Sequence, residues 1–190
     1  MKILLVSTAP DGSRKVSGGA DSALLRPGEP VFTDVPLEDW ELKVAIAMRI
    51  SRLGLHIPLR HAPRHYDAFG AVALRLLLSD DGVPALFHDR AVSPGAWIDA
   101  GAFAGGDLSL AAMRRPLPGR ASEAVDVCTS ISAATLQADD VVSWLSQTMT
   151  LKTGDIIIFA DSALSLAAPL PDTAVTATVG GRESLSVRIK

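Results

Sequence analysis

The stretch that decides the fold lies between residues 145 and 159 and reads Leu145-Ser146-Gln147-Thr148-Met149-Thr150-Leu151-Lys152-Thr153-Gly154-Asp155-Ile156-Ile157-Ile158-Phe159. Its first part completes a helical pattern, in which Asp139 can cap a helix and an apolar face is formed by Val141, Val142, Leu145 and Met149. The residues Thr153-Gly154-Asp155 are a turn signal, and four apolar residues follow them. The sequence therefore predicts a helix, a turn and a buried strand in direct succession.

Strand patterns dominate the rest of the chain. In the segment 40–50, Trp40, Leu42, Val44, Ile46 and Met48 share one parity, while Asp39, Glu41, Lys43 and Arg49 share the other. This alternation predicts a strand with the first set toward a core and the second toward water or a cleft. Residues 2–6 predict a short buried strand, 13–20 a polar loop, 107–116 a strand, and 174–189 a hairpin around Gly180-Gly181. Pro58 and Pro63 limit any helix between them to one or two turns. The fold class predicted is α+β, strand-rich and mixed, with few short helices.

Composition excludes several classes of protein. The chain has 190 residues, of which 48% are hydrophobic, and a formal net charge of −3. This is the size of one domain and the composition of a folded protein. The net charge gives no excess of basic residues that would bind a nucleic acid or an anionic membrane. A single cysteine, Cys128, excludes an internal disulfide framework. Only four apolar residues, 3–6, lie between Lys2 and the polar residues that follow, and no apolar run approaches the roughly 20 residues of a membrane span. We therefore expect a cytoplasmic protein with no nucleic-acid or membrane partner.

Few residues have a spacing that is typical of a catalytic or metal-binding site. His61 and His65 have the spacing of a helical zinc pair, but Pro63 lies between them and arginines flank them, so we interpret them as loop histidines. Cys128 has no neighbouring base and is interpreted as an inert thiol. Asp39 and Glu41 lie two residues apart on a strand and project to the same face. They form either half of a Mg²⁺ or Ca²⁺ site or a solvated acidic pair beside Lys43.

Four segments in collinear order resemble the fumarylacetoacetate hydrolase (FAH) family. Residues 145–157 resemble its helix that ends in a serine and continues through S-x-x-x-T-L-x-x-G-D-x-I into a strand. Residues 20–25 are similar to its K-P-D-S-A-L element, residues 40–46 to its E-x-E-L-A-V-V-I strand, and residues 65–70 to a Y-Y-D-x-I-G element. The resemblance implies one β-sandwich or roll of FAH type over residues 1–190, in which residues 1–20 form a strand and loop and 21–190 the core. It also implies a homodimer, with Trp97, Phe103 and the stretch 164–170 either in its interface or in a larger monomer core.

Members of this family cleave carbon–carbon bonds in β-diketo acids, or decarboxylate or isomerise oxo-acids. They use a divalent metal held by three carboxylates, with the help of a histidine and a lysine. One register of the resemblance places Asp39 and Glu41 at the first two carboxylates, and a competing register places Glu41 and Lys43 there. Leu74 stands at the third. The lysine of K-P-D-S-A-L is replaced by Gly19, the lysine of K-x-F-D falls near Asp89-Arg90, and no histidine precedes His56.

The resemblance therefore implies a catalytically inactive or strongly degenerate FAH-family protein, with Asp39, Glu41 and Leu74 as remnant positions. We expect no catalytic residue, no resident metal and no cofactor, and a role in assembly or in binding a ligand such as a small carboxylic acid. The alternative is a hydrolase or decarboxylase of an acylpyruvate or oxaloacetate type of acid. It would hold Mg²⁺ or Mn²⁺ with Asp39, Glu41 and a third ligand from Asp67, Asp80 or Asp89. An unrelated binding module is the remaining interpretation.

Overall fold

The computed structural model describes residues 1–26, 28–32, 40–77, 84–103, 108–119, 125–129, 136–166 and 171–190, without the side chains of 125–129. Its strands are β1 (Ile3–Thr8), β2 (Arg14–Gly19), β3 (Trp40–Ile50), β4 (Tyr66–Leu77), β5 (Val92–Pro94), β6 (Ile98–Asp99), β7 (Leu110–Pro116), β8 (Val125–Thr129), β9 (Ile156–Phe159), β10 (Leu164–Ser165), β11 (Thr173–Val179) and β12 (Arg182–Ile189). The helices are α2 (Ala138–Ser146) and the short 3₁₀ helices η1 (Asp21–Ala23), η3 (Leu59–Arg64), η4 (Ala85–Phe87), η5 (Ala100–Phe103) and η6 (Ala160–Ser162). None of these helices is long and apolar enough to cross a membrane.

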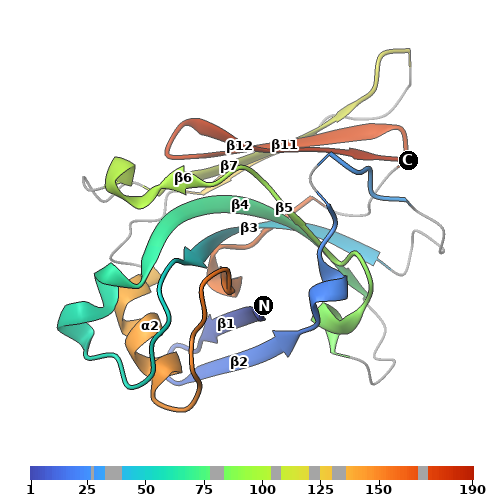
Figure 1. Ribbon diagram of the computed structural model, residues 1–190. Coiled ribbons are helices and arrows are strands. Elements are labelled where there is room, and N and C mark those ends of the chain that lie inside the picture. Colours follow the sequence, from blue (N-terminus) through green and yellow to red (C-terminus); the bar gives the residue numbers. More distant parts are fainter. Residues whose placement is uncertain are drawn as a thin grey trace.

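The strands form two sheets stacked on each other. The first has the order β2-β1-β9-β3-β4-β5, with β10 paired to β3 and β6 to β4, and the second has the order β12-β11-β7-β8. The first sheet is mixed, because β1 and β9 run parallel while β3 pairs antiparallel with β4 and β9. Figure 1 shows the second sheet above β3 and β4, with β1 and β2 below. The predicted strand-rich α+β architecture with few short helices is confirmed.

The first sheet buries side chains on both faces. Leu42, Val44, Ile46 and Met48 of β3 pack in the main core, which also contains Val175, Val179, Leu185 and Ile189 of the second sheet. On the other face of β3, Ala45 and Ala47 belong to a second apolar cluster with Val72, Leu74 and Leu86. The period of two in residues 40–50 is therefore confirmed for the set that faces the main core. On the opposite face of β3, the middle of the strand packs into this second apolar cluster. The charged residues Glu41, Lys43 and Arg49 lie toward the two ends of that face and are half-buried.

The turn before β9 is a structural clamp centred on Asp155. Its side chain is fully buried. One carboxylate oxygen accepts a hydrogen bond from the main-chain N–H of Lys2 at 2.7 Å, and the other accepts one from Lys152 N–H at 2.8 Å and lies 2.7 Å from Lys2 Nζ. Gly154 has a φ of +88°, which favours glycine, and its N–H donates to the carbonyl of Ile50. The clamp thus fixes the start of β1 and β9 and the end of β3.

The end of α2 is held by its own serine. Ser146 Oγ donates to the carbonyl of Ser143 and accepts the N–H of Ile57, each at 2.8 Å. Farther on, Leu151 and Gly54 exchange two main-chain hydrogen bonds. The segment 145–159 is therefore a helix, a turn and a buried strand, as predicted, and its polar groups serve to join elements that are far apart in sequence.

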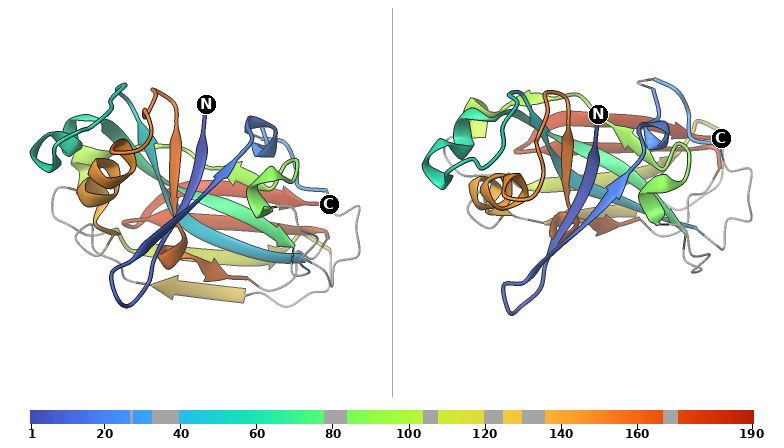
Figure 2. Two further views of the ribbon diagram at one scale, coloured as in Figure 1. Left: turned by 90° about the horizontal axis from the view of Figure 1, so that it is seen from below. Right: turned by 60° about the horizontal axis from the view of Figure 1, so that its bottom comes forward.

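Two local predictions are wrong. Residues 13–20 were expected to form a loop, but β2 pairs with β1 along its whole length, from Ile3 opposite Gly19 to Thr8 opposite Arg14. The resulting hairpin reaches beyond the rest of the first sheet (Figure 2). An edge strand needs only main-chain partners, so an apolar pattern is not required. The predicted cap at Asp139 is also wrong, because α2 begins at Ala138 after Gln137. Asp139 instead accepts a hydrogen bond from the hydroxyl of Tyr66 at 2.9 Å.

Candidate functional site

The positions singled out by the family resemblance meet on one face of the first sheet. Lys43 on β3 lies directly opposite Leu74 on β4, and Glu41 lies opposite Leu76. Residues directly opposite each other in a sheet share a face. Glu41, Lys43 and Leu74 therefore lie together, as the resemblance requires, while Asp39 lies outside the described residues. Lys43, which one of the two registers places at the second carboxylate position, is the residue directly across from Leu74.

Glu41 already has two polar partners. Its Oε1 accepts a hydrogen bond from the hydroxyl of Ser165 at 2.7 Å, and its Oε2 lies 3.1 Å from Lys43 Nζ. Partial burial raises the pKa of Glu41, but the hydrogen bond from Ser165 and the charge of Lys43 outweigh this, so the pKa lies below its ordinary value. The carboxylate is ionised at neutral pH and its charge is balanced by the ammonium. Of the two alternatives left open by the sequence, the arrangement favours an acidic side chain paired with Lys43.

Leu74 is enclosed by apolar side chains. It is 1% exposed and belongs to the cluster that contains Ala45, Val72, Leu86 and Val92. The same cluster includes Ile3 of β1 and Ile156 and Ile158 of β9. None of these side chains carries an oxygen or nitrogen atom. Leu74 is therefore a core residue of this apolar cluster, and the charged side chain nearest to it along the ladder is that of Lys43, directly opposite on β3.

Gly19, where the family motif has a lysine, has no room for a side chain. A Cβ atom built on Gly19 would lie 2.5 Å from Cβ of Leu86 and 2.6 Å from its carbonyl oxygen. The N–H of Ala20 also donates to that carbonyl at 3.2 Å. The 3₁₀ helix η4 thus packs directly on the end of β2. Sequence reasoning missed Leu86, although it stands three residues before Asp89, which is the spacing of the lysine in K-x-F-D.

The candidate third ligands are not gathered around Glu41. The carboxylate of Asp67 accepts two hydrogen bonds from Arg49, at 2.9 Å from Nε and 2.8 Å from Nη2, and this pairing raises the pKa of the guanidinium. Asp89 is exposed and lines a pocket with Arg75 and Arg90. Asp80 lies outside the described residues. Across the described ranges, no three His, Cys, Asp or Glu side chains are grouped as a metal site would require.

The other residues singled out from the sequence make contacts within the fold wherever the structure describes their side chains. His61 and His65 lie in and after η3, a 3₁₀ helix, so their side chains do not have the α-helical geometry of a ligand pair. His61 Nε2 accepts a hydrogen bond from Arg60, and His65 Nδ1 lies 3.3 Å from the carbonyl of Arg52. Phe103 is buried in the main core, and Trp97 is half-buried beneath the guanidinium of Arg49, at 5.7 Å. The side chain of Cys128 is outside the description.

Comparison with known proteins gives a likeness in structure and none in sequence. No family model and no curated protein matches the chain. Among solved structures, a protein from Yersinia pestis CO92 assigned to the FAH family is 13% identical, with a TM-score of 0.75 over 100% of this chain and 93% of its own. The 5-carboxymethyl-2-hydroxymuconate delta-isomerase from Mycobacterium smegmatis is 19% identical, with a TM-score of 0.75 over 99% of this chain and 78% of its own. The fumarylpyruvate hydrolase from Pseudomonas aeruginosa, in complex with Mn²⁺ and pyruvate, is 16% identical, with a TM-score of 0.66 over 100% and 89%. The chain has the fold of the fumarylacetoacetate hydrolase family.

Proposed function

We propose that this protein is a catalytically inactive or strongly degenerate protein of FAH type, which acts by binding a ligand or by assembly. One observation carries the proposal. The described positions that correspond to the family's metal ligands and lysine hold an ion-paired glutamate, an ammonium group, a buried leucine and a glycine closed off by Leu86. The fold has thus been kept while the groups needed for metal-dependent chemistry have been replaced.

The residues at these positions do not fit a divalent metal ion. Mg²⁺ takes six oxygen ligands in near-ideal octahedral geometry, usually one or two carboxylates with several waters. Here Glu41 offers one carboxylate, which already binds Lys43 and Ser165. Each of the two positive charges of the metal ion, about 4 Å from an ammonium, would be repelled by roughly 4 kcal/mol at an effective dielectric constant near 20, and one of them suffices for the comparison. That repulsion alone would weaken binding by about three orders of magnitude.

The proposal is tested by metal binding and turnover on the same protein. A cation that binds the folded state must raise the melting temperature, because it stabilises only that state. We expect saturating Mg²⁺ or Mn²⁺ to leave the melting temperature unchanged, and we expect no turnover of an acylpyruvate or of oxaloacetate above the uncatalysed rate. A metal-dependent rise that disappears in Glu41→Ala, together with turnover, would overturn the proposal.

The alternative is a metal-dependent hydrolase or decarboxylase of a β-diketo or oxo-acid. It is favoured by the ionised carboxylate of Glu41 on the relevant face of the sheet, and by the Mn²⁺ in the fumarylpyruvate hydrolase that shares this fold. It predicts that Glu41→Gln abolishes metal-dependent turnover while the circular dichroism spectrum is unchanged. Equal metal-dependent turnover in Glu41→Gln and in the unaltered protein would contradict this alternative.

Assembly is the second part of the proposal, and we propose a homodimer. Within the segment 53–59, three leucines are exposed to solvent, with exposed fractions of 66% for Leu53, 49% for Leu55 and 50% for Leu59. Large exposed apolar side chains so close together in sequence suit a contact with another protein chain. Sedimentation equilibrium should give a dimer that dissociates more readily when Leu53 and Leu59 are both replaced by serine. A monomer at every concentration tested would contradict this part.

A further inference from the structure

A pocket of about 560 Å³ lies where the segment 94–97 meets β12, the outer strand of the second sheet. It is lined by that segment, by Gly28, and by Glu183, Ser184 and Ser186 of β12. Glu41, Lys43 and Leu74 do not line it, so the pocket is distinct from the candidate site described above. Most of its lining residues are small, and the indole of Trp97 is the largest side chain among them.

Hydrogen bonds on both sides fix the segment that forms one wall of this pocket. The N–H of Gly95 donates to the carbonyl of Ala71 at 2.9 Å, and the N–H of Ala96 donates to the carbonyl of Ser184. Ser184 Oγ accepts the N–H of Ala71 at 2.8 Å and donates to the carbonyl of Ala96 at 2.7 Å. A Cβ atom on Gly95 would collide with the carbonyl oxygen of Ser184. The wall is therefore preformed, and a ligand does not have to order it.

Trp97 gives the pocket a half-buried aromatic wall. The guanidinium of Arg49 lies 5.7 Å from the centre of the Trp97 ring. The carboxylate of Asp67 accepts two hydrogen bonds from that guanidinium, at 2.9 Å and 2.8 Å. Because this ion pair balances the charge of Arg49, it adds no net positive charge beside the pocket. The indole can therefore pack against the apolar part of a ligand and remove it from water.

Glu183 is the only charged side chain among the described residues that line the pocket. Within the described part of the chain, its carboxylate makes neither an ion pair nor a hydrogen bond. The pocket is therefore lined by one negative charge that no other side chain balances.

The carbonyl of Ser186 is a second acceptor on the same strand. Two residues farther on, the carbonyl of Arg188 faces away from β11, because it accepts the N–H of Val31 at 2.8 Å. Carbonyl groups two residues apart in a strand point to the same side, so that of Ser186 also lies on the open edge of β12. No hydrogen bond between described residues uses it.

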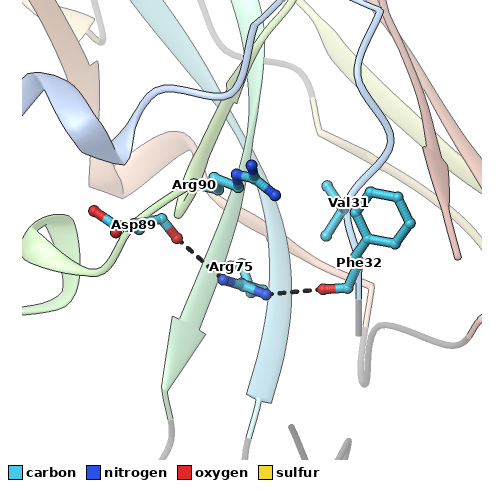
Figure 3. A pocket seen from close by; sticks show the side chains of 5 residues that line it. All are labelled: Val31, Phe32, Arg75, Asp89 and Arg90. Atoms are coloured by element: carbon cyan, nitrogen blue, oxygen red, sulfur yellow. Dashed lines mark hydrogen bonds between the residues drawn. The ribbon is translucent and has the colours of Figure 1, made fainter. Parts of the chain in front are cut away.

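Two other cavities differ from this pocket in the charge of their lining. The cavity shown in Figure 3 has a volume of about 290 Å³ and is lined by Val31, Phe32, Arg75, Asp89 and Arg90. A cavity of about 310 Å³ shares Gly28 and Ser186 with the pocket, and its charged lining residues are Glu29, Arg188 and Lys190. Both cavities contain basic side chains. Among the described residues, the pocket beside Trp97 is lined by none.

We propose that this pocket binds a small organic cation, a protonated primary amine on an apolar body. Glu183 and the carbonyl of Ser186 are the acceptors, and Trp97 is the apolar wall. An ammonium group has three N–H donors and no acceptor, so it suits a pair of oxygen acceptors. A carboxylate in a cavity without basic side chains attracts a cation and repels a carboxylic acid. The inference goes beyond the proposed function, because it concerns another place on the molecule and holds whether or not the protein is catalytic.

The test titrates benzylamine, which is protonated at neutral pH, into the whole protein and follows the binding by NMR. Benzyl alcohol is the neutral probe of the same shape, and benzoate is the anionic one. We expect benzylamine to shift the indole N–H signal of Trp97 and the amide signals of Ala96 and Ser186 with saturation. It should bind about fivefold more tightly than benzyl alcohol, which is the scale of an exposed ion pair, and benzoate should not bind.

Glu183→Gln should weaken the binding of benzylamine about fivefold and leave that of benzyl alcohol unchanged. The side chain of Glu183 is exposed, so the variant is expected to fold. Asp140→Asn, at an exposed aspartate in the first turn of α2, is the matched control and should change neither affinity.

Three results would overturn the inference: no saturable binding of benzylamine, equal affinities for benzylamine and benzyl alcohol, or equal affinities for benzylamine in Glu183→Gln and the unaltered protein. Tighter binding of benzoate than of benzylamine would also overturn it. Failure of the proposed function would be seen elsewhere, as metal-dependent turnover that requires Glu41 and is unaffected by Glu183→Gln.

Discussion

Two carboxylates in this molecule, those of Asp155 and Glu41, lie in segments that resemble the same protein family, and they are used in opposite ways. Asp155 is fully buried, and it joins the start of β1 to the turn before β9 through the main-chain N–H groups of Lys2 and Lys152 and the ammonium of Lys2. Glu41 is half-buried at the margin of an apolar cluster and binds Lys43 on its own strand and Ser165 on a neighbouring one. The first carboxylate holds the fold together, whereas the second adds little to it.

The difference indicates which of the two carboxylates can be replaced at a low cost in stability. Asp155 satisfies main-chain donors that no apolar side chain could satisfy, so its removal leaves buried polar groups without partners. The partners of Glu41 are a hydroxyl and an ammonium group at the margin of the sheet, and the neighbouring apolar cluster with Leu74 and Leu86 stabilises the fold by burial. Replacing Asp155 is therefore expected to cost much stability, and replacing Glu41 to cost little.

The largest effect is expected from restoring a carboxylate at the centre of the apolar cluster. Leu74→Asp places a charge in an apolar cluster, where Lys43, directly opposite on β3, is already paired with Glu41, and it should lower the free energy of unfolding by about 4 kcal/mol. Urea denaturation followed by fluorescence measures this. Leu74→Asn is the control for volume and should cost less, because it buries no charge. A Leu74→Asp protein that is as stable as Leu74→Asn and gains affinity for Mn²⁺ would show that the site can still be assembled.

Removal of the structural carboxylate should come next. Asp155→Ala leaves the N–H groups of Lys2 and Lys152 without their acceptor and should cost about 3 kcal/mol. Thermal and urea unfolding measure the loss. Asp140→Ala, an exposed aspartate in the first turn of α2, is the control and should change the free energy of unfolding by less than about 0.5 kcal/mol. Equal effects of the two substitutions would contradict the role assigned to Asp155.

A smaller effect is expected where β2 meets η4. Gly19→Ala forces Cβ against Leu86 and should cost about 2 kcal/mol. The variant Leu86→Gly removes the nearest of the clashing atoms, the Cβ of Leu86, and leaves its carbonyl oxygen, so the double variant should be less destabilised than the sum of the two single ones. A double-mutant cycle of unfolding free energies tests this coupling. Strict additivity would mean that Leu86 does not close the position of Gly19.

The smallest effect concerns pH. Because the pKa of Glu41 is lowered in the folded state, its ion pair contributes stability above the ordinary value of 4.5 and loses it as the pH falls through the folded-state pKa. The contribution should be below about 1 kcal/mol, as for other partly exposed ion pairs. Glu41→Gln should therefore flatten the acid side of the stability profile slightly. A large loss of stability in Glu41→Gln at pH 7 would place Glu41 among the structural residues, beside Asp155.

Elements with strong local patterns could be predicted from the sequence. The alternation of residues 40–50, the Gly180-Gly181 hairpin, and the succession of α2, turn and β9 all appear as expected. So does the limit that Pro58 and Pro63 set on η3, which spans Leu59–Arg64. In each case the residues that decide the element lie close together in the chain. Short-range periodicity and turn chemistry are sufficient there.

Elements that depend on distant partners were missed. The strand β2 has no apolar pattern and forms because β1 offers a complete set of main-chain partners. Asp139 was expected to cap a helix, but its carboxylate accepts a hydrogen bond from the hydroxyl of Tyr66, which η3 and β4 bring close. The closure of Gly19 by Leu86 joins residues from two separate elements. None of these contacts leaves a signal in the local sequence.

The sequence by itself determined the strand-rich class and the likeness to the FAH family, because each depends on the identity and order of neighbouring residues, and it predicted that Leu74 and Gly19 stand where the family has a carboxylate and a lysine. Only the tertiary structure decided that Lys43 lies opposite Leu74, that Leu86 fills the space at Gly19, and that Arg75 and Arg90 face one pocket. The physical reason is that burial, charge balance and hydrogen bonding act between atoms that are close in space. Which atoms meet is fixed by the pairing of strands, and strand pairing joins residues that are far apart in the chain.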